Sequence, residues 1–132
     1  MVNSSNIVDP RCSIFIELKH HIQTVESCLA EDHSQISTAL QPLQMLFEEQ
    51  VQVLTWEAWP PERRSLLQSL RVEMHKQLRL LNTDLMFFRA AKQPVTLDQR
   101  RSDMGDRLTN LQGYCDAILK LAESPEASGD PS

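Results

Sequence analysis

The chain has 132 residues, which matches a single domain because domain sizes cluster at about 100 to 150 residues. With 41% hydrophobic and 23% charged residues, it can bury a core without a metal or disulfides, so bulk disorder is excluded. Three glycines are too few for the turns of a many-stranded sheet or for a phosphate-binding glycine loop. The composition therefore predicts an all-α protein.

The net charge of −5 is unevenly distributed along the chain. Residues 1–59 hold 2 Lys/Arg and 8 Asp/Glu, a net charge of −6. Residues 60–107 hold 10 Lys/Arg and 6 Asp/Glu, a net charge of +4. Residues 108–132 hold 1 Lys/Arg and 4 Asp/Glu, a net charge of −3. The acidic balance argues against nucleic acid or an anionic membrane as a partner, since phosphate neutralisation dominates such binding. The middle of the chain is still basic enough to form a local basic face.

The first residues lack a basic region followed by an apolar core, so we expect no export signal. The apolar runs are only a few residues long, far short of the ~20 that span a bilayer. Without export, Cys12, Cys28 and Cys115 are expected to stay reduced. These features predict a cytoplasmic protein.

The first predicted helix begins at Asp9-Pro10, because a carboxylate caps a helix start and proline is tolerated in the first helical position. We expect this helix to run to about Glu31. Its apolar residues recur at steps of three and four and form one stripe, which comprises Phe15, Leu18, Ile22, Val25 and Leu29.

The second helical segment contains Pro42, which cannot donate a backbone hydrogen bond inside a helix. Either a helix begins near Gln41 after a short helical turn, or one helix is kinked at Pro42. We favour the first arrangement, because helices accept proline best in their opening turn. The segment should end before the sequence WEAWPP at residues 56–61, and its apolar residues are Ile36, Leu40, Leu43, Phe47 and Leu54.

The third predicted helix covers about residues 62–93, a run without glycine or proline that makes it the longest element. Its core seam comprises Leu67, Leu70, Met74, Leu78, Leu81, Leu85 and Phe88. A capping box at residues 96–99, Thr-Leu-Asp-Gln, predicts the start of a fourth helix. The fourth stripe comprises Met104, Leu108, Leu111, Cys115, Ile118 and Ala122.

Short connections between these helices favour antiparallel neighbours, so the predicted architecture is an up-and-down bundle of about four helices with one long central helix. We expect residues 1–8 to be a flexible N-terminus, residues 9–123 to form a single bundle domain, and residues 124–132 to be a disordered tail with too little apolar content to fold.

Chemistry-bearing side chains form no complete catalytic or metal-binding set. Glu17 and His20 have the Glu-x-x-His spacing of di-iron bundles, but such sites need a second copy and two further inward glutamates. The cysteines and histidines lack zinc-finger spacing. We therefore expect no catalytic residues, no metal and no cofactor, and keep a carboxylate/His metal- or small-ligand-binding bundle as the alternative function.

Basic residues on one flank of the third helix predict a partner-binding ridge for an acidic surface; they are Arg64, Arg71, His75, Arg79 and Arg89. The alternative is a solvated helix face with ordinary ion pairs. Trp56 and Trp59 are either partner-binding anchors or staples of the corner between the second and third helices.

Leu80 and Phe87 lie a heptad apart and away from the core seam of the third helix. They indicate a second contact, which is either a neighbouring helix on that side or self-association into a homodimer.

The second half of the chain contains the pattern LLNTDLMFFRAAKQP at residues 80–94, followed by Arg100-Arg101, Met104, Asp106-Arg107-Leu108 and Tyr114-Cys115. This pattern resembles the cyanobacterial heterocyst-frequency control protein PatD family. The resemblance implies a small non-enzymatic helical protein that influences heterocyst differentiation and is linked to cell division through the tubulin-like protein FtsZ. It assigns no binding residues. The sequence thus predicts a regulatory interaction module.

Overall fold

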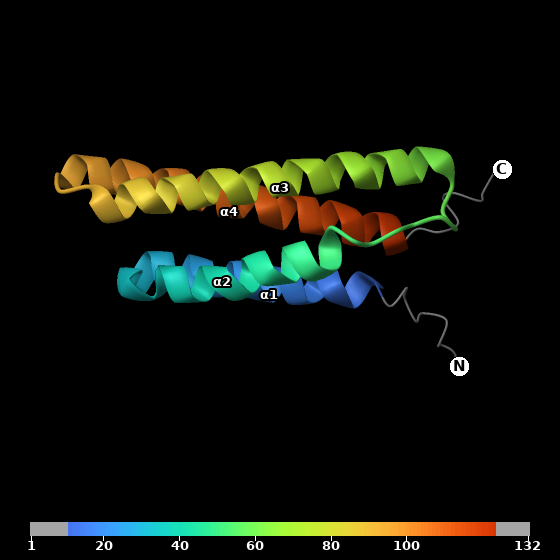
Figure 1. Ribbon diagram of the computed structural model, residues 1–132, viewed down its shortest axis with the longest axis horizontal. Helices are drawn as coiled ribbons and strands as arrows, with labels where there is room; N and C mark the ends of the chain where they lie inside the picture. The colour runs from blue at the N-terminus through green and yellow to red at the C-terminus, as the bar shows by residue number, and fades with distance from the viewer. Residues whose placement is uncertain (1–10, 124–132) are drawn as a thin grey trace.

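The computed structural model describes residues 11–123, and every regular element in this part of the chain is helical (Figure 1). The all-α fold class is therefore confirmed. The Asp9-Pro10 helix start, the flexible segment 1–8 and the disordered tail 124–132 lie outside the described residues. The elements are α1 (Arg11–Glu31), a 3-10 turn η2 (His33–Gln35), α2 (Ile36–Leu46), a π-helical turn η3 (Phe47–Val51), α3 (Pro61–Ala90) and α4 (Pro94–Glu123).

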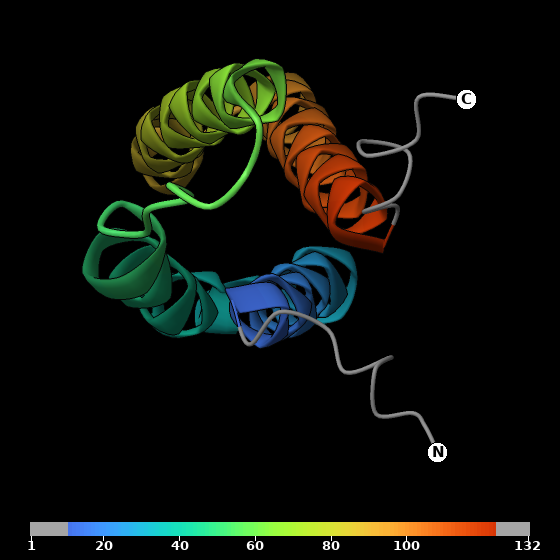
Figure 2. The ribbon, with the colours of Figure 1, turned by 90° about the vertical axis from the view of Figure 1, so that its right-hand side faces the viewer.

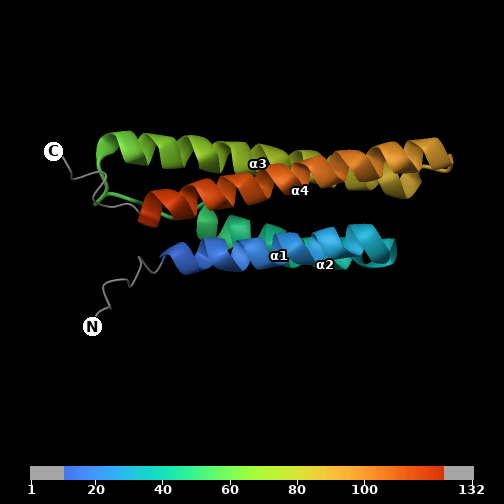
Figure 3. The ribbon, with the colours of Figure 1, turned by 180° about the vertical axis from the view of Figure 1, so that it is seen from behind.

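Successive helices run antiparallel, as expected for an up-and-down bundle (Figure 1). α1 and α2 form one hairpin and α3 and α4 form another, and the two hairpins meet where α4 lies beside α1 (Figure 3). Seen end-on, the helices surround a common interior, and residues 52–60 cross from η3 to the start of α3 (Figure 2). None of the helices described combines the length and apolar character needed to cross a bilayer.

The two hairpins differ in length. α3 has 30 residues and ends at Ala90, three residues before its predicted end. α4 also has 30 residues, so the prediction that α3 is the longest element is wrong, and α2 has 11 residues. The α3–α4 hairpin therefore extends beyond the turn between α1 and α2 (Figure 1).

The predicted stripes form one continuous core. All five residues of the first stripe are buried, as are six of the seven in the α3 seam, and Leu70 packs against the core from its edge. In α4 the buried residues are Met104, Leu108, Leu111, Cys115 and Ile118, whereas Ala122, the last residue of the predicted stripe, is only half-buried. The three- and four-residue spacing of apolar side chains thus identified the buried face of each long helix.

The favoured start of the second helix near Gln41 is wrong. α2 begins at Ile36 and contains Pro42 within it. The chain is turned into the helix earlier, because the Asp32 carboxylate accepts hydrogen bonds from the backbone N–H of Ser34 at 3.2 Å and from its hydroxyl at 2.6 Å. Pro42 has no N–H to donate to the carbonyl of Thr38, four residues earlier. Both residues are exposed, so solvent can reach that carbonyl and the proline is tolerated inside the helix.

The capping box predicted at residues 96–99 is also wrong. α3 ends at Ala90 and α4 begins at Pro94, so Thr96 lies inside the first turn. The Gln93 carbonyl accepts from the N–H groups of Thr96 at 3.1 Å and Leu97 at 3.0 Å. The N–H of the first helical residue makes no hydrogen bond within the helix, so proline is well accepted in that position. Pro94 therefore begins α4 two residues before Thr96. The Gln99 amide donates instead to Asp103, at 3.0 Å.

Candidate interaction surface

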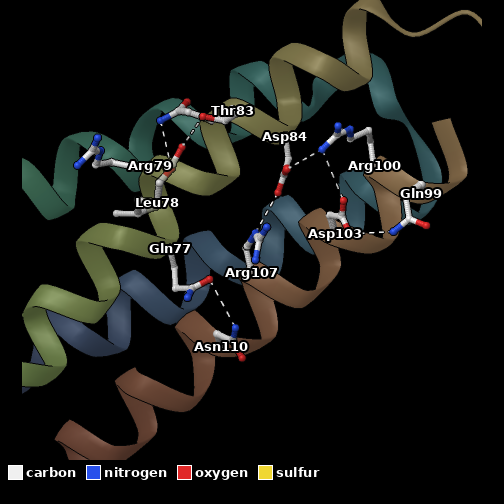
Figure 4. Close-up of polar contacts among 11 residues, drawn as sticks. Gln77, Leu78, Arg79, Thr83, Asp84, Gln99, Arg100, Asp103, Arg107 and Asn110 are labelled. Carbon is white, nitrogen blue, oxygen red and sulfur yellow. Dashed lines mark hydrogen bonds and ion pairs between the residues drawn. The ribbon is translucent and has the colours of Figure 1, made fainter. Parts of the chain in front are cut away.

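The predicted basic ridge lies on the side of α3 that faces α2 and η3, and several of its members contact that segment. The His75 ring stacks on Phe47 with 5.9 Å between centroids, and Arg89 Nη1 donates to Ser37 Oγ at 3.0 Å. The exposed Arg79 side chain points away from the α3–α4 interface (Figure 4). The ridge is therefore partly structural, and its members differ in how freely they can meet a partner.

Arg71 fastens the end of η3 to α3. Its Nη1 donates to the carbonyls of Val51 at 2.9 Å and Leu54 at 2.8 Å, and its Nη2 donates to Gln68 Oε1 at 2.6 Å. The guanidinium also lies 5.2 Å from the centroid of the Trp56 ring. Burial lowers the pKa of Arg71 from its ordinary value, because the cation loses part of its hydration.

An open groove of about 440 Å³ lies between residues 54–57 and the first turns of α3. We call it the Arg64–Arg71 groove. Arg64 is exposed at this groove, and its Nη1 donates to the Glu57 carbonyl at 3.4 Å. The lining residues are Leu54, Thr55, Trp56, Glu57, Pro61, Arg64, Ser65, Gln68 and Arg71. This groove brings together Arg64, Arg71 and Trp56 from the predicted set.

The two tryptophans have different positions. Trp56 is 6% exposed and belongs to the core cluster, so it acts as a staple of the corner between η3 and α3. Trp59 is half-buried and packs against the edge of the core, with the Arg63 guanidinium 5.3 Å from its ring centroid. Arg63 Nη1 also donates to the Leu121 carbonyl at 3.0 Å, which joins the start of α3 to the end of α4.

The proposed self-association residues lie on the outer part of α3 and do not belong to its buried seam. Leu80 is half-buried and Phe87 is 49% exposed. The Arg100 guanidinium lies 4.6 Å from the centroid of the Phe87 ring, so α4 covers one side of this phenylalanine. Homodimer formation stays a prediction.

Sequence reasoning missed a polar cluster between α3 and α4 (Figure 4). Asp84 is 3% exposed, and its carboxylate accepts from Arg107 Nε at 3.0 Å and lies 3.5 Å from Arg100 Nη1. Gln77, 6% exposed, meets Asn110 at 3.5 Å. The seven-residue spacing places Arg100 and Arg107 on one face of α4, but it does not indicate that Asp84 of α3 lies opposite them.

The residues considered for metal binding are not brought together. Glu17 and His20 are both exposed, and Glu17 Oε2 lies 3.7 Å from His21 Nε2. Between residues 11 and 123, no group of three or more His, Cys, Asp or Glu side chains is arranged to hold a metal ion. Cys12 and Cys115 are buried and Cys28 is half-buried.

Comparisons with models of protein families, with curated proteins and with solved structures found no match for this chain. The relationship to the PatD family therefore stays a prediction from the residues that carry the resemblance.

Proposed function

We propose that this protein is a non-enzymatic regulatory module that acts in the cytoplasm by binding a protein partner. The resemblance to the PatD family suggests FtsZ as that partner and the control of heterocyst differentiation as the process. The proposal includes no catalytic step and no cofactor.

The observation that carries the proposal is the position of the resembling residues within the fold. All of them belong to the α3–α4 hairpin, and Asp84 in the α3 part of the pattern contacts Arg100 and Arg107 in the α4 part. The apolar members Leu81 and Met104 are buried in the core. Members distant in sequence contact one another, so the resembling residues lie together in one folded unit.

A binding experiment with purified FtsZ tests this proposal. The full chain should co-purify with FtsZ, and binding should be compared between intact FtsZ and FtsZ without its C-terminal peptide, which locates the contact on the partner. Failure to bind either form would contradict the FtsZ assignment.

Metal analysis of the purified protein tests the non-enzymatic, cofactor-free part of the proposal separately. We expect substoichiometric metal only. Stoichiometric iron, manganese or zinc that survives dialysis would instead support a metal-binding bundle.

A further inference from the structure

We propose that the Arg64–Arg71 groove binds a carboxylate-bearing segment of a protein partner. The inference rests on the proposed function only in that the ligand belongs to a protein, and it holds whether or not that protein is FtsZ. Three observations support it. Within residues 11–123, neither Arg71 nor Arg64 pairs with a carboxylate, and the groove lining combines apolar side chains with these two arginines.

Arg71 is a partly desolvated cation whose hydrogen-bond partners are all neutral oxygens. Three of the five N–H groups of its guanidinium are used, two on carbonyls and one on the Gln68 amide oxygen, which leaves two for another acceptor. No carboxylate within residues 11–123 pairs with it. An incoming carboxylate would therefore neutralise a charge that the fold has partly removed from water.

Arg64 is similarly uncompensated. Arg64 is exposed, and the single polar contact of its side chain is the 3.4 Å hydrogen bond to a carbonyl. No carboxylate in the described chain pairs with it. The arginines of α4 differ, because Arg100, Arg101 and Arg107 each lie within 3.7 Å of an aspartate. Two unneutralised guanidinium groups thus occur in one groove, while those of α4 are already paired.

The groove lining selects a peptide over a phosphate polyanion. Leu54, Trp56 and Pro61 supply apolar surface beside the two arginines, which suits a segment with an aliphatic or aromatic side chain next to an acidic one. The lining holds only two arginines and also Glu57, so a nucleic acid backbone or an anionic membrane would bring more negative charge than the groove can neutralise.

Nuclear magnetic resonance titration with a synthetic peptide tests the site. The probe is an acetylated, amidated peptide, Gly-Glu-Leu-Glu-Leu-Glu-Gly, and its matched control replaces each Glu with Gln. The Glu peptide should shift the indole N–H signal of Trp56, which lines the groove, and leave that of Trp59 unchanged. The Gln peptide should bind at least about tenfold more weakly, since hydrogen bonds to charged groups contribute most of the affinity.

Variants at two arginines of the same helix provide the matched comparison. Arg64→Ser should weaken binding about tenfold, whereas Arg79→Ser, which removes the same charge outside the groove, should change it less than about twofold. Arg71→Lys keeps the charge but loses the fork geometry, and it should also weaken binding. Unchanged binding to Arg64→Ser, or equal binding of the Gln peptide, would overturn the proposal.

The remaining outcomes separate this inference from the proposed function. If FtsZ binds wild type and Arg64→Ser equally, the groove assignment fails while the proposed function stands. If the Glu peptide binds as expected but FtsZ does not, the groove assignment stands and the FtsZ assignment fails. If Arg64→Ser changes the sedimentation of the protein alone, the groove is an interface between two copies and the proposal is wrong.

Discussion

At the scale of single residues, arginines that look equivalent in the sequence have different roles because their surroundings differ. Arg71 and Arg79 lie two turns apart on α3, yet Arg71 holds two carbonyls and covers a buried tryptophan, while Arg79 is exposed. Replacing Arg71 should therefore affect stability as well as binding. Arg64 reports on binding more cleanly, because only one long hydrogen bond is lost with it.

Cys115 provides a residue-scale prediction. Burial raises the pKa of its thiol to about 12, and the neighbouring Asp116 carboxylate adds to the shift. At pH 8 only roughly one thiol in 10,000 is then ionised, so native Cys115 should not react with iodoacetamide. Cys28 is half-buried and should react first. Mass spectrometry of partly alkylated protein checks this order, with urea-unfolded protein as the control in which all three cysteines react.

The same shift predicts how stability depends on pH. The thiol ionises near its ordinary value of 9.0 when unfolded and at about 12 when folded. Between these values the folded state binds more protons, so this group's contribution to stability is complete below pH 9 and falls as the pH rises toward 12. Cys115→Ala should reduce that loss in denaturant unfolding. An alkylation rate for native Cys115 equal to that of Cys28 would contradict both statements.

At the scale of elements, the pairing of α3 with α4 is specified by buried polar groups as well as by apolar stripes. Asp84 lies next to the core residues Leu81 and Leu85, where an unpaired carboxylate would be costly. Its contacts with Arg107 and Arg100 hold only in one register of the two helices. Another register would lose at least one of the two contacts of a buried charge, so the cluster favours the observed alignment.

Arg107→Gln tests this role. We expect it to lower the free energy of unfolding by about 1 to 3 kcal/mol, because the buried Asp84 loses its 3.0 Å charged donor and keeps only the longer contact with Arg100. Arg101→Gln is the matched control, since its pair with Asp98 is exposed on both sides and should contribute less than about 1 kcal/mol. If urea unfolding shows that both variants lower the free energy of unfolding equally, the contact between Arg107 and Asp84 has no special role in stability.

At the scale of the whole molecule, the two hairpins differ in length, and exposed apolar side chains lie on the outer side of the longer one. Phe87 is 49% exposed and Met86 is 68% exposed, both near the end of α3. The turn between α3 and α4 extends beyond the turn between α1 and α2 (Figure 1), whereas Phe88 still contacts His33 of the shorter hairpin, with 5.3 Å between the ring centroids. The shorter hairpin therefore leaves the end of the longer one partly uncovered.

Self-association through Leu80 and Phe87 is the prediction at this scale. Sedimentation equilibrium at micromolar concentration should show a dimer, and Phe87→Glu should dissociate it because a buried charge is costly at an interface. The new glutamate would face Arg100, so helical content should stay unchanged. Val53→Glu, at another exposed apolar position, is the control and should stay dimeric. A monomeric wild type would show that this face does not mediate self-association.

The sequence by itself determined the helical class, the approximate helix bounds and most core residues. These features depend on local properties, namely the three- and four-residue recurrence of apolar side chains and the scarcity of glycine. The two wrong helix starts show the limit of local signals. At Pro42 and Thr96 a valid helix-start motif was present, but Asp32 and Pro94 lie upstream and begin the helices earlier.

Only the tertiary structure decided which polar residues meet. The contact of Arg71 with Val51 spans 20 residues, and that of Asp84 with Arg107 spans 23. Periodicity shows on which face of its own helix a side chain lies, but not the residue that a neighbouring helix places opposite. Arg71 therefore could not be distinguished from Arg79 in the sequence, although desolvation and the acceptors within reach give the two arginines different roles.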